Sequence, residues 1–173
     1  SVYGYARYQE TGERHYYLGR RYRLRVEERD GPSRVVLRNR TTLELQVRVG
    51  SDAKERERIL RRWYRVRLRE LVAPLLTKWE AILGLREAAV GIRKMKTKWG
   101  ACSVNARRIW LNLELAKKPV QCIEYLIVHE LTHFNERRHN DRFVSLMDRH
   151  LPQWRRHRKA LNEAPLGHAD WTY

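Results

Sequence analysis

His129, Glu130 and His133 form the pattern with the clearest chemistry in this sequence, arranged as H-E-x-x-H. They lie in the apolar run VQCIEYLIVHELTHF, which follows Pro119, a residue favoured at the first position of a helix. Four residues apart on a helix, both imidazoles project from one face and can bind one zinc ion. Glu130 can accept a proton from a zinc-bound water, whose pKa the metal lowers to about 7. The pattern predicts a hydrolytic metal site.

Two alternative readings of this pattern are weaker. Two histidines four apart also occur by chance on surface helices, but burial of both imidazoles and the carboxylate without a partner would cost several kcal/mol. A purely structural zinc site is the second alternative, and Glu130 argues against it because such a site has no use for a carboxylate beside an open position. We therefore expect a catalytic metal.

A hydrolytic zinc site needs a third protein ligand and an open fourth position. His139 is the preferred ligand because its spacing from His133 matches the metzincin pattern H-E-x-x-H-x-x-G-x-x-H, although Glu136 replaces the glycine. Zinc is favoured over iron, manganese or nickel because nitrogen-rich sites with an open position suit it. The other candidates for the third ligand are Asp141, Asp148, His150, His157 and Glu163.

The part of the chain that precedes the H-E-x-x-H helix is predicted to begin with β-strands. Between Tyr16 and Val49 apolar and charged residues alternate, which is typical of half-buried antiparallel strands, with turns at residues 18–19 and 30–32. We expect an N-terminal β region at residues 1–51 and a metal-binding core at residues 52–173. Because no linker or repeat separates them, the two parts should pack as one unit.

A long amphipathic helix is predicted from Asp52 to Leu83, with Glu55 completing a capping box. Pro74 lies inside it, which predicts a kink or a break into two helices. Two strands should follow at residues 92–99 and 108–115.

Residues 100–105, between these two strands, include the residue types that favour turns, among them Gly, Ser and Asn. Beyond the H-E-x-x-H helix, Asn140 or Asp141 can cap a further helix, and a last helix should begin at Leu151-Pro152. The tail at residues 165–173 is expected to be irregular.

The composition excludes several classes of protein. No stretch approaches the roughly 20 uncharged apolar residues that a membrane span needs, and 42% hydrophobic residues suffice for one sizeable core. The first residues, SVYGYARYQE, lack a basic leader followed by an apolar run, so we expect no secretory signal and a cytoplasmic location. Cys102 and Cys122 are too few for a disulfide scaffold and are expected to be buried thiols.

The chain of 173 residues is strongly basic. Its net charge is +17, and 29 of its 37 basic residues are Arg, the side chain best suited to bidentate contact with phosphate. Nonspecific binding to nucleic acid is therefore expected. The arginines are scattered, and no helix-turn-helix, zinc-finger or RNP pattern is present. Whether the basic surface has a function stays open.

Several segments together resemble one family. The sequence IRKMKTKWGACS at residues 92–103, IWLN at 109–112, VHELTH at 128–133 with His139, and Leu151-Pro152 resemble the YgjP-like family of predicted zinc-dependent hydrolases. Residues 17–24 and 63–65 resemble its N-terminal half. Ala101 stands where a serine is usual, and Arg138-His139-Asn140 where Asn-His-Ser is usual.

The resemblance implies an α+β fold, with N-terminal antiparallel strands followed by a zincin-like core of helices and a small sheet. It implies Zn²⁺ bound by His129, His133 and His139, with Glu130 as catalytic acid and base. The family is mostly labelled metallopeptidase by analogy, and one member is described as a nucleotide pyrophosphatase acting on UTP. Fold alone does not choose between these activities.

We consider a zinc-dependent metallopeptidase first, with strand 108–115 pairing with an extended peptide beside the cleft. A nucleoside triphosphate pyrophosphatase is the alternative, since a triphosphate needs cationic contacts. A nucleic-acid-associated protease is a further alternative, suggested by the basic charge. The residues nominated for substrate binding are Arg93, Lys96, Lys98 and Asn112, with Lys94 in the same basic segment.

Overall fold

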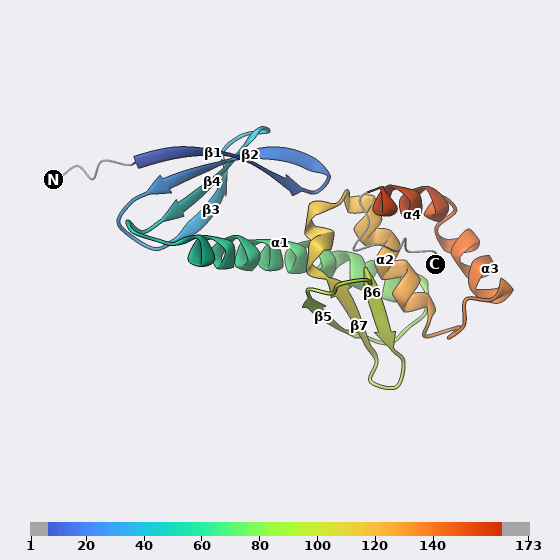
Figure 1. Ribbon diagram of the computed structural model, residues 1–173. Coiled ribbons are helices and arrows are strands. Elements are labelled where there is room, and N and C mark those ends of the chain that lie inside the picture. Colours follow the sequence, from blue (N-terminus) through green and yellow to red (C-terminus); the bar gives the residue numbers. More distant parts are fainter. Residues whose placement is uncertain (1–6, 164–173) are drawn as a thin grey trace.

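The computed structural model describes residues 7–163, with side chains from residue 14 onward. A four-stranded sheet lies over the N-terminal half of one long helix, and the C-terminal half of that helix enters a core of shorter helices and a three-stranded sheet (Figure 1). The predicted α+β class and the order of its parts are confirmed. The tail predicted to be irregular, residues 165–173, lies outside the described residues.

The N-terminal sheet has the order β1-β2-β4-β3. The β1–β2 and β3–β4 pairings are antiparallel as predicted, but β2 and β4 pair in parallel. This parallel pairing arises because β3 lies on the outer side of β4, so the β3–β4 hairpin returns the chain to a place beside β2. The strands are β1 (Arg7–Tyr17), β2 (Arg20–Glu28), β3 (Arg34–Leu37) and β4 (Thr42–Val47).

Helix α1 (Ala53–Ile82) is a single helix of 30 residues. Asp52 caps it, since the Asp52 side chain accepts a hydrogen bond of 2.8 Å from the backbone N–H of Glu55. Pro74 does not divide the helix, so the predicted break is wrong. The buried residues Val72 and Leu76 lie on either side of Pro74, and their packing against the core offsets the hydrogen bond that proline cannot donate.

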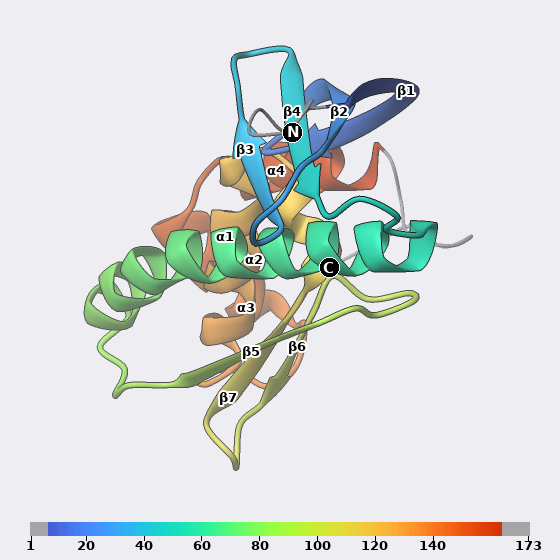
Figure 2. The ribbon, with the colours of Figure 1, turned by 90° about the vertical axis from the view of Figure 1, so that its left-hand side faces the viewer.

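The small sheet has the order β5-β7-β6, and β7 is parallel to β5 and antiparallel to β6. Figure 2 shows α1 between this sheet and the β3–β4 hairpin. Strand β7 ends where a short 3-10 helix, η1 (Leu113–Lys117), begins, so the predicted strand 108–115 is too long. The strands are β5 (Ala89–Arg93), β6 (Gly100–Ser103) and β7 (Arg108–Asn112).

Two further predictions in this region are wrong. The strand predicted at 92–99 ends at residue 93, and residues 94–99 form a loop. Residues 100–103, predicted as part of a turn, form β6, and the turn follows at 104–107. The glycine and serine of β6 favour turns in isolation, and the pairing with β7 makes this segment a strand.

Helix α2 (Val120–Thr132) is the central element of the core. Its apolar side chains are almost all fully buried, and it packs on α1, α3 (Asp141–His150), α4 (Trp154–Asn162) and the small sheet. Asn140 caps α3 by accepting a hydrogen bond of 3.0 Å from the backbone of Phe143, as predicted.

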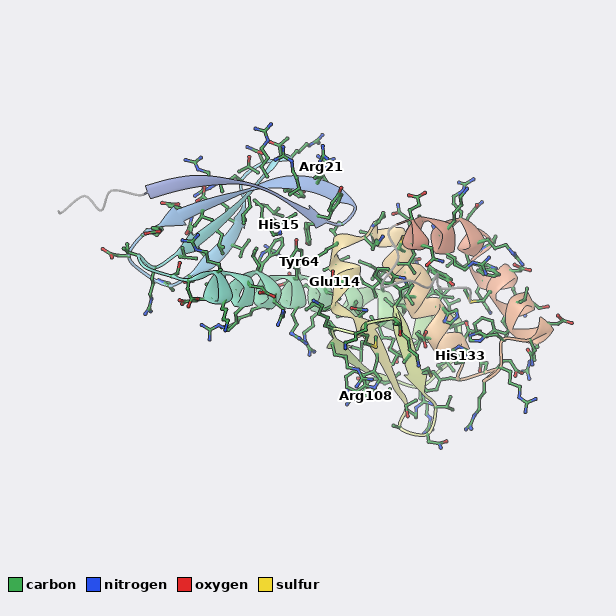
Figure 3. All side chains as sticks on the ribbon, viewed as in Figure 1. His15, Arg21, Tyr64, Arg108, Glu114 and His133 are labelled. Carbon is green, nitrogen blue, oxygen red and sulfur yellow. The ribbon has the colours of Figure 1, made fainter. Side chains whose placement is uncertain are left out.

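The N-terminal sheet is held against the core at the β1–β2 turn. The backbone N–H groups of Leu18 and Gly19 donate to the carbonyls of Ala116 and Lys117, each at 2.9 Å. The Tyr64 hydroxyl donates to the Tyr16 carbonyl at 2.7 Å, and Figure 3 shows Tyr64 pointing from α1 toward the end of β1.

Basic side chains project around the whole outline of the molecule (Figure 3). The net charge of +17 is therefore distributed over many elements, as the scattered arginines predict. Within residues 7–163, none of the helices has the length and apolar character that crossing a membrane requires.

Candidate active site

Three imidazoles converge at the C-terminal end of α2. His129 lies in the last turn of α2, His133 follows at the end of the helix, and His139 comes from the loop before α3. One nitrogen from each ring lies within 4.8 Å of the others. The ring centroids are 5.0 Å apart for His129 and His133, 5.2 Å for His129 and His139, and 4.6 Å for His133 and His139.

The orientation of the His133 ring fits metal binding. Its Nδ1 lies 3.1 Å from the carbonyl oxygen of Glu136. A carbonyl only accepts, so Nδ1 carries the proton and Nε2 keeps its lone pair for a metal. The Phe143 ring packs against all three imidazoles, with centroid distances of 5.1, 4.8 and 4.9 Å to His129, His133 and His139. One aromatic side chain therefore forms a wall behind the histidines.

The protonation states of the histidines also fit a metal site. Burial lowers the pKa of His133. Burial and then the neighbouring His129 and His133 lower the pKa of His139 to about 4. Both rings are thus neutral near pH 7, the form that a metal requires. The three histidines offer only nitrogen donors on one side of a cavity, and such a donor set suits zinc better than calcium or magnesium, which prefer oxygen.

Glu130 is buried beside the imidazoles. Its Oε1 lies 3.0 Å from Nδ1 of His129, and its exposed fraction is 2%. The side chain also lies against β6, where Gly100 offers no Cβ.

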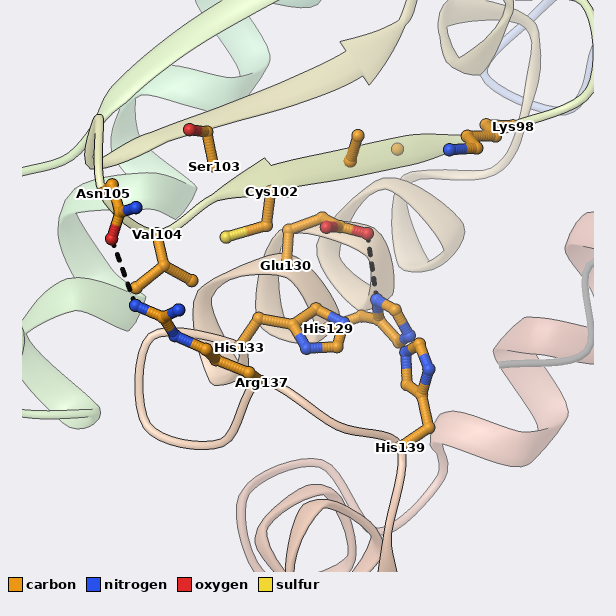
Figure 4. Close-up of a pocket in the computed structure, with 12 residues that line it drawn as sticks. Lys98, Cys102, Ser103, Val104, Asn105, His129, Glu130, His133, Arg137 and His139 are labelled. Carbon is orange, nitrogen blue, oxygen red and sulfur yellow. Dashed lines mark hydrogen bonds and ion pairs between the residues drawn. The ribbon is translucent and has the colours of Figure 1, made fainter.

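A cavity of about 530 Å³ opens over the three histidines and Glu130. Figure 4 shows Glu130 between the histidines and Cys102 of β6, whereas the side chain of Ser103 points away from Glu130. Lys98 lies toward one end of the cavity. Arg137 lies toward the other, where its guanidinium donates to the Asn105 side chain at 3.1 Å.

Both cysteines have free thiols. Cys122 is buried as predicted, but Cys102 is half-buried and lines the cavity. Burial, and then the charge of Glu130, raises the pKa of the Cys102 thiol to about 12. The Cys102 thiol is therefore protonated at neutral pH and is a poor nucleophile.

A comparison with family models gives a match over residues 4–164, to the family described as YgjP-like, metallopeptidase domain. The chain belongs to this YgjP-like family. The resemblance inferred from its motifs is thus confirmed. A comparison with curated proteins gives no match.

Two solved structures are similar to this YgjP-like chain. The metallopeptidase zymogen abylysin of Pyrococcus abyssi is 24% identical, with a TM-score of 0.48 over 51% of this chain and 89% of that one. The zymogen jannalysin of Methanocaldococcus jannaschii is 21% identical, with a TM-score of 0.42 over 45% of this chain and 79% of that one.

The other candidates for a third ligand do not join the histidine cluster of the YgjP-like domain. Among the described residues, the group close enough to share a metal consists of His129, His133 and His139. Asp148, for example, accepts hydrogen bonds from Trp154 at 2.8 Å and from Arg155 at 2.6 Å. The other candidates outside this group are Asp141, His150, His157 and Glu163.

The nominated substrate-binding residues lie in different places. Lys98 lines the cavity, whereas Arg93, Lys96 and Asn112 are not among the described residues that line it. The Arg93 guanidinium lies 4.3 Å from the centre of the Trp110 ring, and Lys96 is exposed.

Asn112 is fully buried and organises the loop that carries Lys98. Its side-chain amide donates to the carbonyls of Met95, at 2.8 Å, and Lys98, at 2.7 Å. Its Oδ1 accepts from the backbone of Glu114 at 3.1 Å.

The strand beside the cavity is β6 and not the predicted strand at 108–115. Strand β7 is paired on both sides, by β5 and β6, and so cannot receive a further strand. β5 and β6 are the two edge strands of this sheet, and the residues of β6 line the cavity.

Sequence reasoning also missed Arg137, which is one basic residue among many. The signal that could have singled it out is its position between two ligand candidates, His133 and His139, which places it at the rim of any site that they form.

Proposed function

We propose that this chain is a zinc-dependent peptidase. In this proposal His129, His133 and His139 bind the metal, and Glu130 transfers a proton from the attacking water to the leaving amine. The observation that carries the proposal is the convergence of the three imidazoles and a buried carboxylate on one cavity bordered by an edge strand. The family adds support, because its domain is described as a metallopeptidase domain.

Bound zinc would supply Lewis-acid polarisation of the scissile carbonyl and would lower the pKa of the attacking water. The histidines leave room for substrate because all three approach from α2 and the loop after it, while the opposite side of the cavity is formed by β6. The carbonyl of Glu136 fixes the His133 ring through Nδ1.

Glu130 is the general base in this proposal. It accepts a proton from the attacking water and then donates that proton to the departing amine nitrogen. Its Oε1 is held near Nδ1 of His129, and Gly100 lets the side chain approach β6 closely. The carboxylate is thus positioned before substrate arrives, which lowers the cost of reaching the transition state.

An extended peptide fits the free edge of β6. The backbone N–H of Asn112 donates to the Trp99 carbonyl at 2.9 Å, so Trp99 points its backbone toward β7. In an antiparallel ladder this direction alternates, which leaves the backbone groups of Gly100 and Cys102 directed toward the free edge. A peptide that pairs with these two residues lies beside Glu130.

Nucleoside triphosphate hydrolysis is the second candidate, favoured by one observation. Lys98 and Arg137 both line the cavity, and two cations can bind the phosphates of a substrate such as UTP. In the peptidase reading the same two residues bind acidic side chains or the terminal carboxylate of a peptide.

One experiment separates the two activities. Zinc-loaded protein is incubated with unstructured casein and, separately, with each of the four common nucleoside triphosphates. The peptidase proposal expects new amino termini from casein and no release of pyrophosphate. Release of pyrophosphate with intact casein would replace the proposal by the second candidate.

A further inference from the structure

A second cavity, of about 730 Å³, lies between β3 and the N-terminal half of α1. None of the residues that line it also lines the cavity over the histidines. Its floor is apolar and includes Val35 of β3 together with Ile59 and Val66 of α1. Val66 is 45% exposed, so this apolar surface is open to solvent. We call this cavity the β3–α1 groove.

The β3 side of the groove is the free edge of a sheet, since β3 is the last strand in the order β1-β2-β4-β3. The Arg38 N–H donates to the Thr42 carbonyl at 3.1 Å, so the backbone of residue 38 points toward β4. The alternation of an antiparallel ladder then directs the backbone groups of Val35 and Leu37 to the free edge. These two residues can pair with an added strand.

The rim of the groove is cationic. Arg34, Arg48, Arg58 and Arg62 line it, against the single carboxylate of Glu55. The four arginine side chains are exposed, and the ion pair between Arg58 and Glu55 is long, at 3.9 Å. The groove therefore has an excess of positive charge beside an apolar floor and a row of backbone hydrogen-bonding groups.

We propose that the β3–α1 groove binds an extended, acidic peptide segment of a partner protein. The segment adds a strand to β3 through Val35 and Leu37, places alternate apolar side chains on the floor, and directs acidic side chains to the arginines. Each feature of the groove matches one feature of such a segment. The edge strand can pair with its backbone, the apolar floor can contact its apolar side chains, and the arginines of the rim can bind its acidic side chains.

A single-stranded nucleic acid fits the groove less well. It needs aromatic faces on which bases stack. Trp63 is the aromatic residue among those described as lining the groove, and its ring already packs against Tyr17 and Tyr64, with centroid distances of 4.8 and 5.2 Å. An edge strand and an apolar floor also contribute nothing to a phosphate backbone.

The test uses the full chain in a Glu130→Gln background, so that a peptide probe is not consumed. The probe is a fluorescein-labelled ten-residue peptide of alternating Val and Glu, and its binding is followed by fluorescence anisotropy. A peptide of alternating Val and Lys and a ten-residue oligo-dT are measured in parallel. The test variant is Arg48→Glu/Arg62→Glu. The matched control, Arg69→Glu/Arg86→Glu, makes the same charge change at exposed arginines outside the groove.

The proposal expects the Val-Glu peptide to bind and the Val-Lys peptide not to bind. Affinity for the Val-Glu peptide should fall at least tenfold in the test variant and less than threefold in the control. Equal losses in both variants would show that only the overall charge attracts the peptide, and would overturn the proposal. Oligo-dT that binds more tightly than the peptide and loses affinity only in the test variant would overturn it in favour of nucleic acid.

A backbone variant tests the strand addition separately. Val35→Pro removes an N–H that points to the free edge, where proline is tolerated in a strand, so the fold should be retained. Loss of one ladder hydrogen bond should weaken peptide binding about fivefold. Unchanged affinity, with an unchanged circular dichroism spectrum, would exclude strand addition at β3.

Discussion

Gly100 of β6 lies directly against the side chain of Glu130 on α2. A Cβ at position 100 would lie 3.2 Å from both Cγ and Oε1 of Glu130, and 3.1 Å from Cδ1 of Leu126. Those distances are tighter than ordinary van der Waals contact, so any side chain there must displace its neighbours. The absence of a side chain in β6 thus sets how closely the carboxylate approaches the edge strand.

Gly100→Ala should therefore impair catalysis without removing the metal site. A displacement of Glu130 by a few tenths of an ångström should lower kcat on casein by about 10-fold to 100-fold. Zinc content by elemental analysis should stay at one per chain, because the atoms nearest to an added Cβ belong to Leu126 and Glu130 and not to a histidine. A variant with full kcat would show that the close contact is unimportant.

His139→Ala should abolish stoichiometric zinc binding, because two imidazoles alone hold zinc weakly. His157→Ala is the control, since His157 lies on α4 outside the histidine cluster. Equilibrium dialysis followed by elemental analysis measures both variants. Zinc retained at full affinity in His139→Ala would place the third ligand elsewhere.

Asn112→Leu should destabilise the protein by about 1–3 kcal/mol, because it removes the donor of two partly buried hydrogen bonds to the carbonyls of Met95 and Lys98. The free energy of unfolding in urea measures this loss. Asn105→Ala, at an exposed position, should change that free energy by less than about 0.5 kcal/mol. Equal stability of the two variants would mean that the Asn112 amide does not hold the loop at 94–99.

Glu44 should make the stability of the N-terminal sheet depend on acid pH. Its hydrogen bonds with Arg38, at 2.8 and 3.0 Å, lower the pKa of this buried carboxyl from 4.5 to about 2. A depressed pKa stabilises the folded state fully above about pH 4.5, and this contribution is lost as the pH falls toward 2.

Glu44→Gln should therefore lower the free energy of unfolding by about 1–3 kcal/mol at pH 7 and reduce its loss on acidification. Glu27 provides the contrast, because burial and the neighbouring Glu44 raise its pKa. Glu27→Gln should not destabilise the protein at pH 7. Urea titrations at pH 7, 4 and 2.5 test both variants. If the free energy of unfolding of Glu44→Gln depended on pH in the same way as that of the unmodified protein, the assignment of this pH dependence to Glu44 would be refuted.

The parts of this molecule that sequence predicts well are those fixed by local chemistry. The H-E-x-x-H spacing places His129 and His133 on one helix face whatever surrounds them. The cap at Asp52 depends on one side chain and the backbone three residues later. The alternation in the N-terminal strands likewise reports which residues face α1.

The parts that sequence predicts poorly depend on contacts between distant residues. β6 is a strand because it pairs with β7, although Gly100 and Ser103 favour turns. The parallel pairing of β2 and β4 follows from where the β3–β4 hairpin inserts, which no local pattern encodes. Lys98 lines the cavity and Lys96 does not. Asn112 holds the loop that carries both lysines, through a hydrogen bond to the carbonyl of Lys98, which lies 14 residues earlier in the sequence.

The most direct test of the account is the turnover of casein by zinc-loaded Glu130→Gln beside the unmodified protein. Glutamine preserves the size of the side chain but cannot accept a proton from water at neutral pH. We predict one zinc per chain in both proteins and a rate lower by at least about 100-fold in the variant. Turnover near that of the unmodified protein, at equal zinc content, would contradict the assignment of Glu130 as the general base.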